Sequence, residues 1–307
     1  MTQEQEKIVA EIKQLQKEKN AIILGHYYVR DEVQEIADYV GDSYYLSQVA
    51  TETDADVIVF AGVSFMAESA KLLNPEKTVL HPDTLSDCPM AHMADVATIE
   101  KMRQEYEDLA VVCYINSTGE LKAHSDVCVT SSNALKIVSL LPNKNIFFIP
   151  DENLGRYIAS KLPEKHFIFN PGYCHVHKSI TLENVLEAKK AKPNVKMLAH
   201  PECRLEVLEQ ADFIGSTKAI IEYARTHEDK EFLICTELGV LYQMRKENPD
   251  KKFYSVGHRQ YCPNMKRITL ENVRDVLRDN LNEVFVTEEF RKAANAPLEK
   301  MLELAAK

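Results

Sequence analysis

The sequence lacks several features that would place it in a familiar class of protein. No stretch approaches the ~20 apolar residues that a membrane-spanning helix needs, and the charged segment 1–20 has no apolar core typical of a secretion signal. No long basic run occurs, and 47 acidic residues against 37 basic ones give a formal net charge of −10. These absences predict a cytoplasmic protein that binds neither nucleic acid nor a membrane.

What the sequence contains is typical of a folded globular chain. Hydrophobic residues make up 45% and charged residues 27%, which excludes disordered and fibrous proteins. A chain of 307 residues is longer than one hydrophobic core usually organises, so two or three domains are expected. Its seven cysteines are an odd number in a chain too large to need disulfide bonds. We therefore expect reduced thiols.

An internal repeat of about 87 residues organises the chain. Three aspartates recur at intervals of 88 and 86 residues: Asp38, Asp126 and Asp212. Three cysteines recur at intervals of 86 and 88 residues: Cys88, Cys174 and Cys262. A common strand–helix pattern could produce such a period by chance, but the hexapeptide ITLENV at 180–185 and 268–273 independently supports the register.

Each repeat contains four apolar strand-like runs that alternate with helical segments. The first strands of the three units are predicted at 21–28, 110–116 and 195–202. This alternation predicts an α/β fold of three αβα sandwich domains, each with a small parallel sheet, related by pseudo-threefold symmetry. The predicted domains are 1–105, 106–192 and 193–307, with the active site where the three meet. The helix within 280–307 is expected to pack back on the first domain.

Residues at the ends of these strands are candidates for a binding site, because ligands of parallel α/β sheets bind beyond the carboxyl ends of the strands. Three sets of equivalent positions are His26, Tyr114 and His200; Tyr28, Asn116 and Glu202; and Ser43, Ser131 and Thr217. The last three stand where helices should begin, so helix capping is an alternative role for their hydroxyls. Three helix N-termini that converge would instead favour a small anion carrying carboxylates or phosphate.

The cysteines divide into two groups by the same alignment. Four fall in apolar or structural positions and are expected to be buried thiols: Cys113, Cys128, Cys203 and Cys235. The three that recur in every unit are candidate metal ligands. A zinc ion would usually require a fourth protein ligand, for which His175 or His177 is available. An iron–sulfur cluster held by three thiolates would leave one iron free, and spacing alone does not choose between the two.

Several segments resemble the quinolinate synthase family, and the resemblance covers essentially the whole chain. They include GHYYV (25–29), VCYINSTGELKAHSDVCVTSSNA (112–134), AHPEC (199–203) and CPNMKRITLENV (262–273). The resemblance implies three pseudo-symmetric αβα domains around a [4Fe–4S] cluster with one iron not ligated by protein. It also implies that iminoaspartate (iminosuccinate) condenses with dihydroxyacetone phosphate to quinolinate, phosphate and water, in NAD biosynthesis.

Carried over by position, the resemblance assigns roles to named residues. The cluster ligands would be Cys88, Cys174 and Cys262. The substrate site would be lined by His26, Ser43, Tyr114, Ile115, Asn116, Ser131, His200, Pro201, Glu202 and Thr217. Acid–base catalysis would fall to Tyr28, Glu202, His26 and Tyr114. His177 is expected either to support Cys174 or to contact substrate. Met265 stands where many members carry another cysteine, so a disulfide at the last ligand is excluded.

Three other classes of protein fit parts of the pattern. They are a dehydratase with the same open iron but another substrate, a zinc-stabilised binding module, and a redox or iron sensor. The sensor is disfavoured because the acidic chain has no evident DNA-binding segment. A transient contact with the aspartate-oxidising enzyme is also expected, because iminoaspartate hydrolyses readily.

Overall fold

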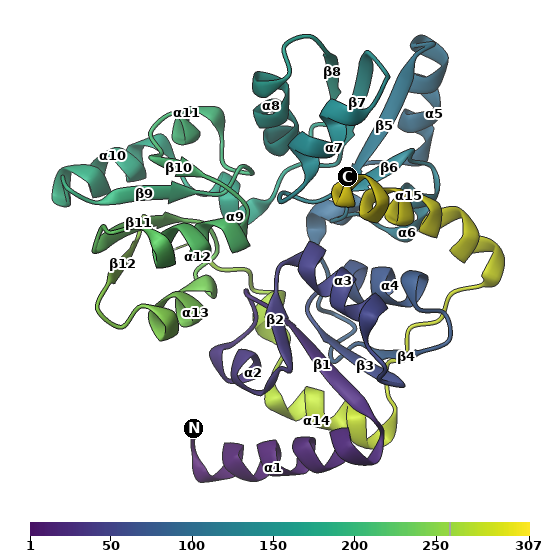
Figure 1. The fold of residues 1–307 in the computed structure, drawn as a ribbon, viewed down its shortest axis with the longest axis vertical. Coiled ribbons are helices and arrows are strands. Elements are labelled where there is room, and N and C mark those ends of the chain that lie inside the picture. The colour runs from purple at the N-terminus through teal and green to yellow at the C-terminus, as the bar shows by residue number, and fades with distance from the viewer. Residues whose placement is uncertain (258) are drawn as a thin grey trace.

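Three separate four-stranded parallel sheets form the framework of the computed structural model, which describes residues 1–257 and 259–307 (Figure 1). The strand orders are β2-β1-β3-β4, β6-β5-β7-β8 and β10-β9-β11-β12. The same order recurs in each sheet, with the first strand of the unit beside the second and the third. The predicted fold class, three α/β units each built on a small parallel sheet flanked by helices, is thereby confirmed.

The elements follow the chain without a long linker. The first unit contains α1 (Gln3–Glu18), β1 (Ala21–His26), α2 (Asp31–Ile36), β2 (Tyr39–Gly41), α3 (Ser43–Glu52), β3 (Val57–Ala61), α4 (Ser64–Leu73), β4 (Thr78–Leu80), η1 (Pro89–His92) and α5 (Val96–Glu105). The second contains β5 (Leu109–Tyr114), α6 (Gly119–Ala123), β6 (Val127–Val129), α7 (Ala134–Leu140), β7 (Asn145–Ile149), α8 (Glu152–Lys161), β8 (His166–Phe169), α9 (His175–Lys178) and α10 (Leu182–Ala191). The third contains β9 (Lys196–Ala199), α11 (Leu205–Leu208), β10 (Phe213–Ile214), α12 (Thr217–Thr226), β11 (Glu231–Cys235), α13 (Val240–Glu247) and β12 (Lys252–Ser255). After it come η2 (Met265–Arg267), α14 (Leu270–Asp279) and α15 (Glu288–Ala306).

The three recurring aspartates have the same structural role in every unit. One carboxylate oxygen of Asp38, Asp126 and Asp212 accepts a hydrogen bond from a backbone amide of the first strand, at 2.8, 2.7 and 2.8 Å. Each aspartate amide in turn donates to a carbonyl of that strand, at 2.9 Å in all three units. The aspartate thus joins the second strand to the first, which explains why it recurs at this position.

The two carboxyl-terminal helices pack away from the third unit that precedes them. α14 packs on α1 and β3 of the first unit. α15 contacts α4 of the first unit and also covers α6, β6 and α7 of the second, as Figure 1 shows in yellow. The last helix therefore packs against both the first and the second unit. The predicted domain boundaries at residues 105 and 192 stay predictions.

Apolar burial is continuous from the first unit to the second. One hydrophobic cluster includes residues of β1, β3, β5 and β7, and two smaller clusters lie on the sheet of the third unit. Every residue of β5 is buried, as expected for a parallel strand covered on both faces. None of the helices in the described ranges has the length and apolar character needed to cross a membrane.

Candidate active site

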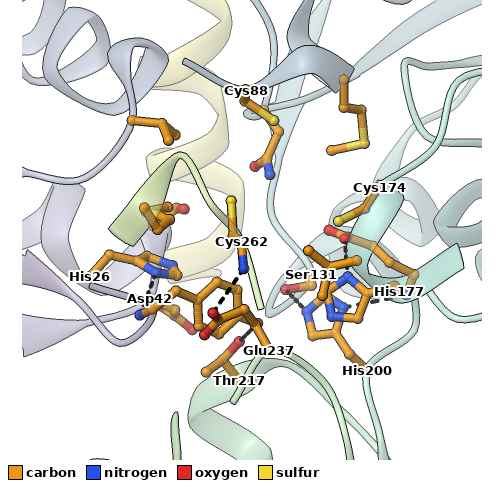
Figure 2. Close-up of a pocket in the computed structure, with 18 of the residues that line it drawn as sticks. His26, Asp42, Cys88, Ser131, Cys174, His177, His200, Thr217, Glu237 and Cys262 are labelled. Carbon is orange, nitrogen blue, oxygen red and sulfur yellow. Dashed lines mark hydrogen bonds and ion pairs between the residues drawn. The ribbon is translucent and has the colours of Figure 1, made fainter. Parts of the chain in front are cut away.

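The carboxyl ends of the central strands surround one cavity, to which all three units contribute side chains (Figure 2). Its empty volume is about 760 Å³, part of which is open to solvent. The predicted site residues that line it are His26, Tyr28, Ser43, Cys88, Tyr114, Asn116, Ser131, Cys174, His200, Glu202, Thr217 and Cys262. The other two, Ile115 and Pro201, are buried next to lining residues in the chain but are not among those that line the cavity. The structure therefore brings together all the binding-site candidates that the repeat selected, while Ile115 and Pro201 were implied by the family resemblance alone.

The hydroxyls at the predicted helix starts are not helix caps. Asp42 caps α3 by accepting from the Tyr45 amide at 3.0 Å, and Ser216 caps α12 by accepting from the Ala219 amide at 3.3 Å. Ser43 and Thr217 are the first helical residues, one position later. The alternative role as caps was wrong for both, and their side chains line the cavity instead.

Ser131 differs from its two counterparts. It lies three residues before the first residue of α7, so the predicted helix start at this position was wrong. Its Oγ lies 3.2 Å from Nε2 of His200 and lines the cavity. Only two of the three predicted helix N-termini therefore begin at the cavity wall.

His26 and His200 occupy equivalent positions and make the same backbone contact. Nδ1 of His26 accepts from the Tyr28 amide at 3.1 Å, and Nδ1 of His200 accepts from the Glu202 amide at 3.4 Å. Burial lowers the pKa of each imidazole to about 3, so both rings are neutral near pH 7. Because Nδ1 accepts, the ring proton lies on Nε2. Both rings line the cavity, so His200 can donate to Ser131 and His26 to a ligand.

Glu202 is the most constrained carboxylate in the cavity wall. Tyr114 donates its hydroxyl hydrogen to Oε1 at 2.5 Å, and Nδ1 of His177 lies 2.7 Å from Oε2. The His177 contact is close but poorly aligned for a hydrogen bond. Burial acts to raise the pKa of Glu202, but His177, His200 and the Tyr114 hydroxyl outweigh it and hold it at about 2.

His177 connects Glu202 to Tyr28, another of the predicted acid–base residues. Its Nε2 lies 3.0 Å from Oγ1 of Thr236, which lies 2.9 Å from the hydroxyl of Tyr28. The same Tyr28 hydroxyl lies 2.7 Å from Oγ1 of Thr217. Burial raises the pKa of Tyr28 well above its usual value, so the phenol stays protonated. A hydrogen-bonded chain therefore runs from His177 through Thr236 to Tyr28, and Glu202 lies against its His177 end.

The repeat did not indicate Thr236, and it left the role of His177 open. Thr236 comes directly after β11, and the residues in the same place after β3 and β7 are Gly62 and Pro150. Neither of those carries a hydroxyl, so the alignment of the units gave no signal there. A general search for hydroxyl residues after a strand would have included Thr236.

The three recurring cysteines face the cavity from three different units. Figure 2 shows the sulfurs of Cys88, Cys174 and Cys262 directed toward the same space. Burial raises the pKa of all three thiols, that of Cys88 to about 12, and neighbouring thiols raise the pKa of Cys88 and Cys174 further. Backbone amides of the turn after each cysteine act to lower the pKa of its thiol, but burial outweighs them. The other four cysteines are fully buried, as predicted.

Comparison with known proteins decides the family. A family model described as "Quinolinate synthetase A protein" matches residues 10–303. The chain belongs to this family. The quinolinate synthase of Caldicellulosiruptor saccharolyticus is 51% identical over 98% of this chain and 99% of the relative. That of Fusobacterium nucleatum is 53% identical over 96% and 98%, and that of Clostridioides difficile is 50% identical over 96% and 97%.

The quinolinate synthase resemblance inferred from sequence motifs is therefore confirmed, and the donor atoms of the cavity fit metal binding. Cys174, His177 and Glu202 place one ligand atom each within 4.8 Å of one another. However, His177 and Glu202 are already paired, and His177 also contacts Thr236. His177 and Glu202 therefore already have partners within the protein and do not require a metal ion.

The three cavity cysteines are spaced more widely than the group of Cys174, His177 and Glu202. In the part of the chain that the structure describes, the sulfurs of Cys88, Cys174 and Cys262 do not all lie within 4.8 Å of one another. Two thiolates on one tetrahedral zinc would stand about 3.8 Å apart, since each Zn–S bond is about 2.3 Å. A cluster with its own inorganic sulfides spans a wider gap between thiolates than a single zinc ion does.

Proposed function

We propose that the chain is a quinolinate synthase, which condenses iminoaspartate with dihydroxyacetone phosphate to quinolinate, phosphate and water in NAD biosynthesis. The match to the family over nearly the whole chain carries this conclusion. The cavity supports the same reaction on physical grounds. It combines candidate metal ligands, a neutral histidine that can donate a hydrogen bond to an anionic group, and a hydrogen-bonded chain that can carry a proton.

We further propose that Cys88, Cys174 and Cys262 hold a [4Fe–4S] cluster with one iron not ligated by protein. When bound, such a cluster supplies a Lewis acid that assists the departure of a hydroxyl group as water. The support is that the three sulfurs point toward the same cavity from three different units and do not all lie within 4.8 Å of one another.

Anionic groups of the substrates are assigned to polar residues that line the cavity. Ser43 and Thr217 offer hydroxyls at the first residues of α3 and α12, whose N-termini favour negative charge. Neutral His26 offers its Nε2 hydrogen. No described residue hydrogen-bonds Oδ1 of Asn116, although this atom is buried at the cavity, so it is free to accept from a substrate N–H or O–H. Ile115 and Pro201 are proposed to shape the wall through their neighbours.

Proton transfer during isomerisation of the triose carbonyl requires an acid and a base on a small carbon skeleton. A carboxylate with a pKa of about 2 is a weak base, so we assign Glu202 to orienting the ring of His177. His177 and Tyr28 then exchange the proton with substrate, and Thr236 links the two. Tyr114 holds the second oxygen of Glu202 in place. Contact with an aspartate-oxidising enzyme and a cytoplasmic location stay predictions.

Product analysis tests the proposed reaction against the dehydratase alternative. Protein purified without oxygen is incubated with dihydroxyacetone phosphate and iminoaspartate formed from oxaloacetate and ammonia. A quinolinate synthase forms quinolinate and phosphate in equal amounts, and omission of the triose abolishes both. Phosphate-independent turnover of a hydroxy acid, without quinolinate, would instead support the dehydratase.

A further inference from the structure

A carboxylate accepts a hydrogen bond from the backbone amide of each cavity cysteine. The Cys88 amide donates to Oδ1 of Asp87 at 2.8 Å. The Cys174 amide donates to Oδ2 of Asp151 at 3.0 Å. The Cys262 amide donates to Oε1 of Glu237 at 3.0 Å. None of the three carboxylates belongs to the proton-transfer chain.

The three units make this contact by two different routes. Asp151 and Glu237 stand two residues after the ends of β7 and β11, and both are fully buried. The equivalent residue after β3 is Val63, which has no acceptor, and Asp87 next to the cysteine takes its place. The contact between a carboxylate and the cysteine amide therefore occurs in the first unit as well, although the aligned position there carries no carboxylate.

Backbone contacts hold the two buried carboxyl groups rigidly. The other oxygen of Asp151 accepts from the Leu154 amide at 2.7 Å, and the other oxygen of Glu237 accepts from the Gly239 amide at 2.6 Å. Lys266 lies 3.3 Å from Glu237, whereas no ion pair to Asp151 occurs among the described residues. Each carboxyl group thus joins the loop of a cysteine to the end of a strand.

We propose that Asp87, Asp151 and Glu237 are positioning residues that fix the three cysteine amides and keep the reduction potential of the bound cluster low. This inference rests on the proposed function. Hydrogen bonds to the sulfurs and the local charge both set the potential of an iron–sulfur cluster. An amide that donates to a carboxyl oxygen is not available to a cluster sulfur, whether that carboxyl group is charged or neutral. A charged carboxylate also disfavours the addition of an electron to the cluster.

A low potential suits the proposed reaction. Condensation, dehydration and ring closure are redox-neutral overall, so the cluster need not accept an electron at any step. A cluster that resists reduction keeps the charge of its unligated iron constant through turnover. The three carboxyl groups would therefore preserve the Lewis acid rather than take part in bond making.

The test is an anaerobic redox titration of the cluster in Asp151→Ala and Glu237→Ala. The matched control is Asp95→Ala, because Asp95 also caps a helix, by accepting from the Thr98 amide at 2.8 Å, but touches no cysteine. At a fixed potential, the ratio of reduced to oxidised cluster should rise about tenfold in each test variant, which is 59 mV for one electron. The control should match the wild type.

Two results separate this inference from the proposed function. A wild-type protein without a cluster would overturn the proposed function itself. A wild-type cluster whose potential is unchanged in both test variants would overturn the inference alone. If the buried variants do not fold, Asp87→Ala decides, since Asp87 is partly exposed and its replacement leaves both buried carboxyl groups intact. An unchanged potential there would also overturn the inference.

Discussion

Replacement of Thr236 by valine tests the proton-transfer chain directly. Valine keeps the shape of the side chain but removes the hydroxyl that stands 3.0 Å from His177 and 2.9 Å from Tyr28. Among the described residues, no other side chain hydrogen-bonds both of these groups. The substitution therefore interrupts the chain and leaves Tyr28 bonded to Thr217 and His177 paired with Glu202.

The expected loss can be bounded from general acid–base catalysis, which contributes about 10²–10⁴-fold to a rate. We expect kcat for quinolinate formation to fall by about 10²-fold, with KM changed by less than about threefold, because Thr236 does not line the cavity. Loss of two buried hydrogen bonds should lower the free energy of unfolding by about 1–3 kcal/mol.

The assay is steady-state quinolinate formation by oxygen-free protein, with visible absorbance as a check that the cluster is retained. Tyr28→Phe and the Tyr28→Phe/Thr236→Val double variant complete a cycle. Residues that act as one unit lose activity non-additively, so the double variant should be about as active as Tyr28→Phe alone. A kcat for Thr236→Val within about threefold of the wild type would refute the chain as the route of the proton.

Other expectations concern the ligands, the carboxylate and pH. Cys174→Ala should lose the visible charge-transfer absorbance of the cluster, and an unchanged spectrum would remove Cys174 from the ligand set. Glu202→Gln should cut turnover while the spectrum persists, and largely intact activity would show that the charge is not needed. His26 and His200 have pKa values of about 3 in the fold against 6.5 unfolded, so the unfolded chain binds more protons between these values. The free energy of unfolding should thus be steady above pH 6.5. Below pH 6.5, each of the two histidines should lower it by roughly 1 kcal/mol per pH unit. Urea titrations at pH 6.5 and 5.5 measure this difference. Equal stability at both values would contradict the assignment of neutral, buried rings.

The sequence predicted the framework well because the framework is what the units share. Asp38 and its two counterparts recur since each ties a second strand to the first, and this recurrence set the register of the whole alignment. The strand-end residues then fell on one cavity because all three sheets have the same strand order. Two helices begin at Ser43 and Thr217 as predicted, with Asp42 and Ser216 as their caps, whereas α7 begins three residues after Ser131.

The chemistry was harder to predict because it depends on positions where the units differ. His177 follows Cys174 by three residues, and the equivalent residues in the other units are Ala91 and Met265. Thr236 likewise has no hydroxyl counterpart. Neither residue could be selected by recurrence, and the contact of His177 with Glu202 joins α9 of the second unit to the turn after β9 of the third. Such contacts depend on the packing of the units, which no local pattern encodes.

Iron and acid-labile sulfide analysis of oxygen-free protein tests most directly whether the three units share one cluster. The account predicts about four iron atoms and four sulfides per chain, and loss of both in Cys88→Ala, Cys174→Ala and Cys262→Ala alike. One zinc ion per chain without sulfide, or iron retained in all three variants, would contradict it.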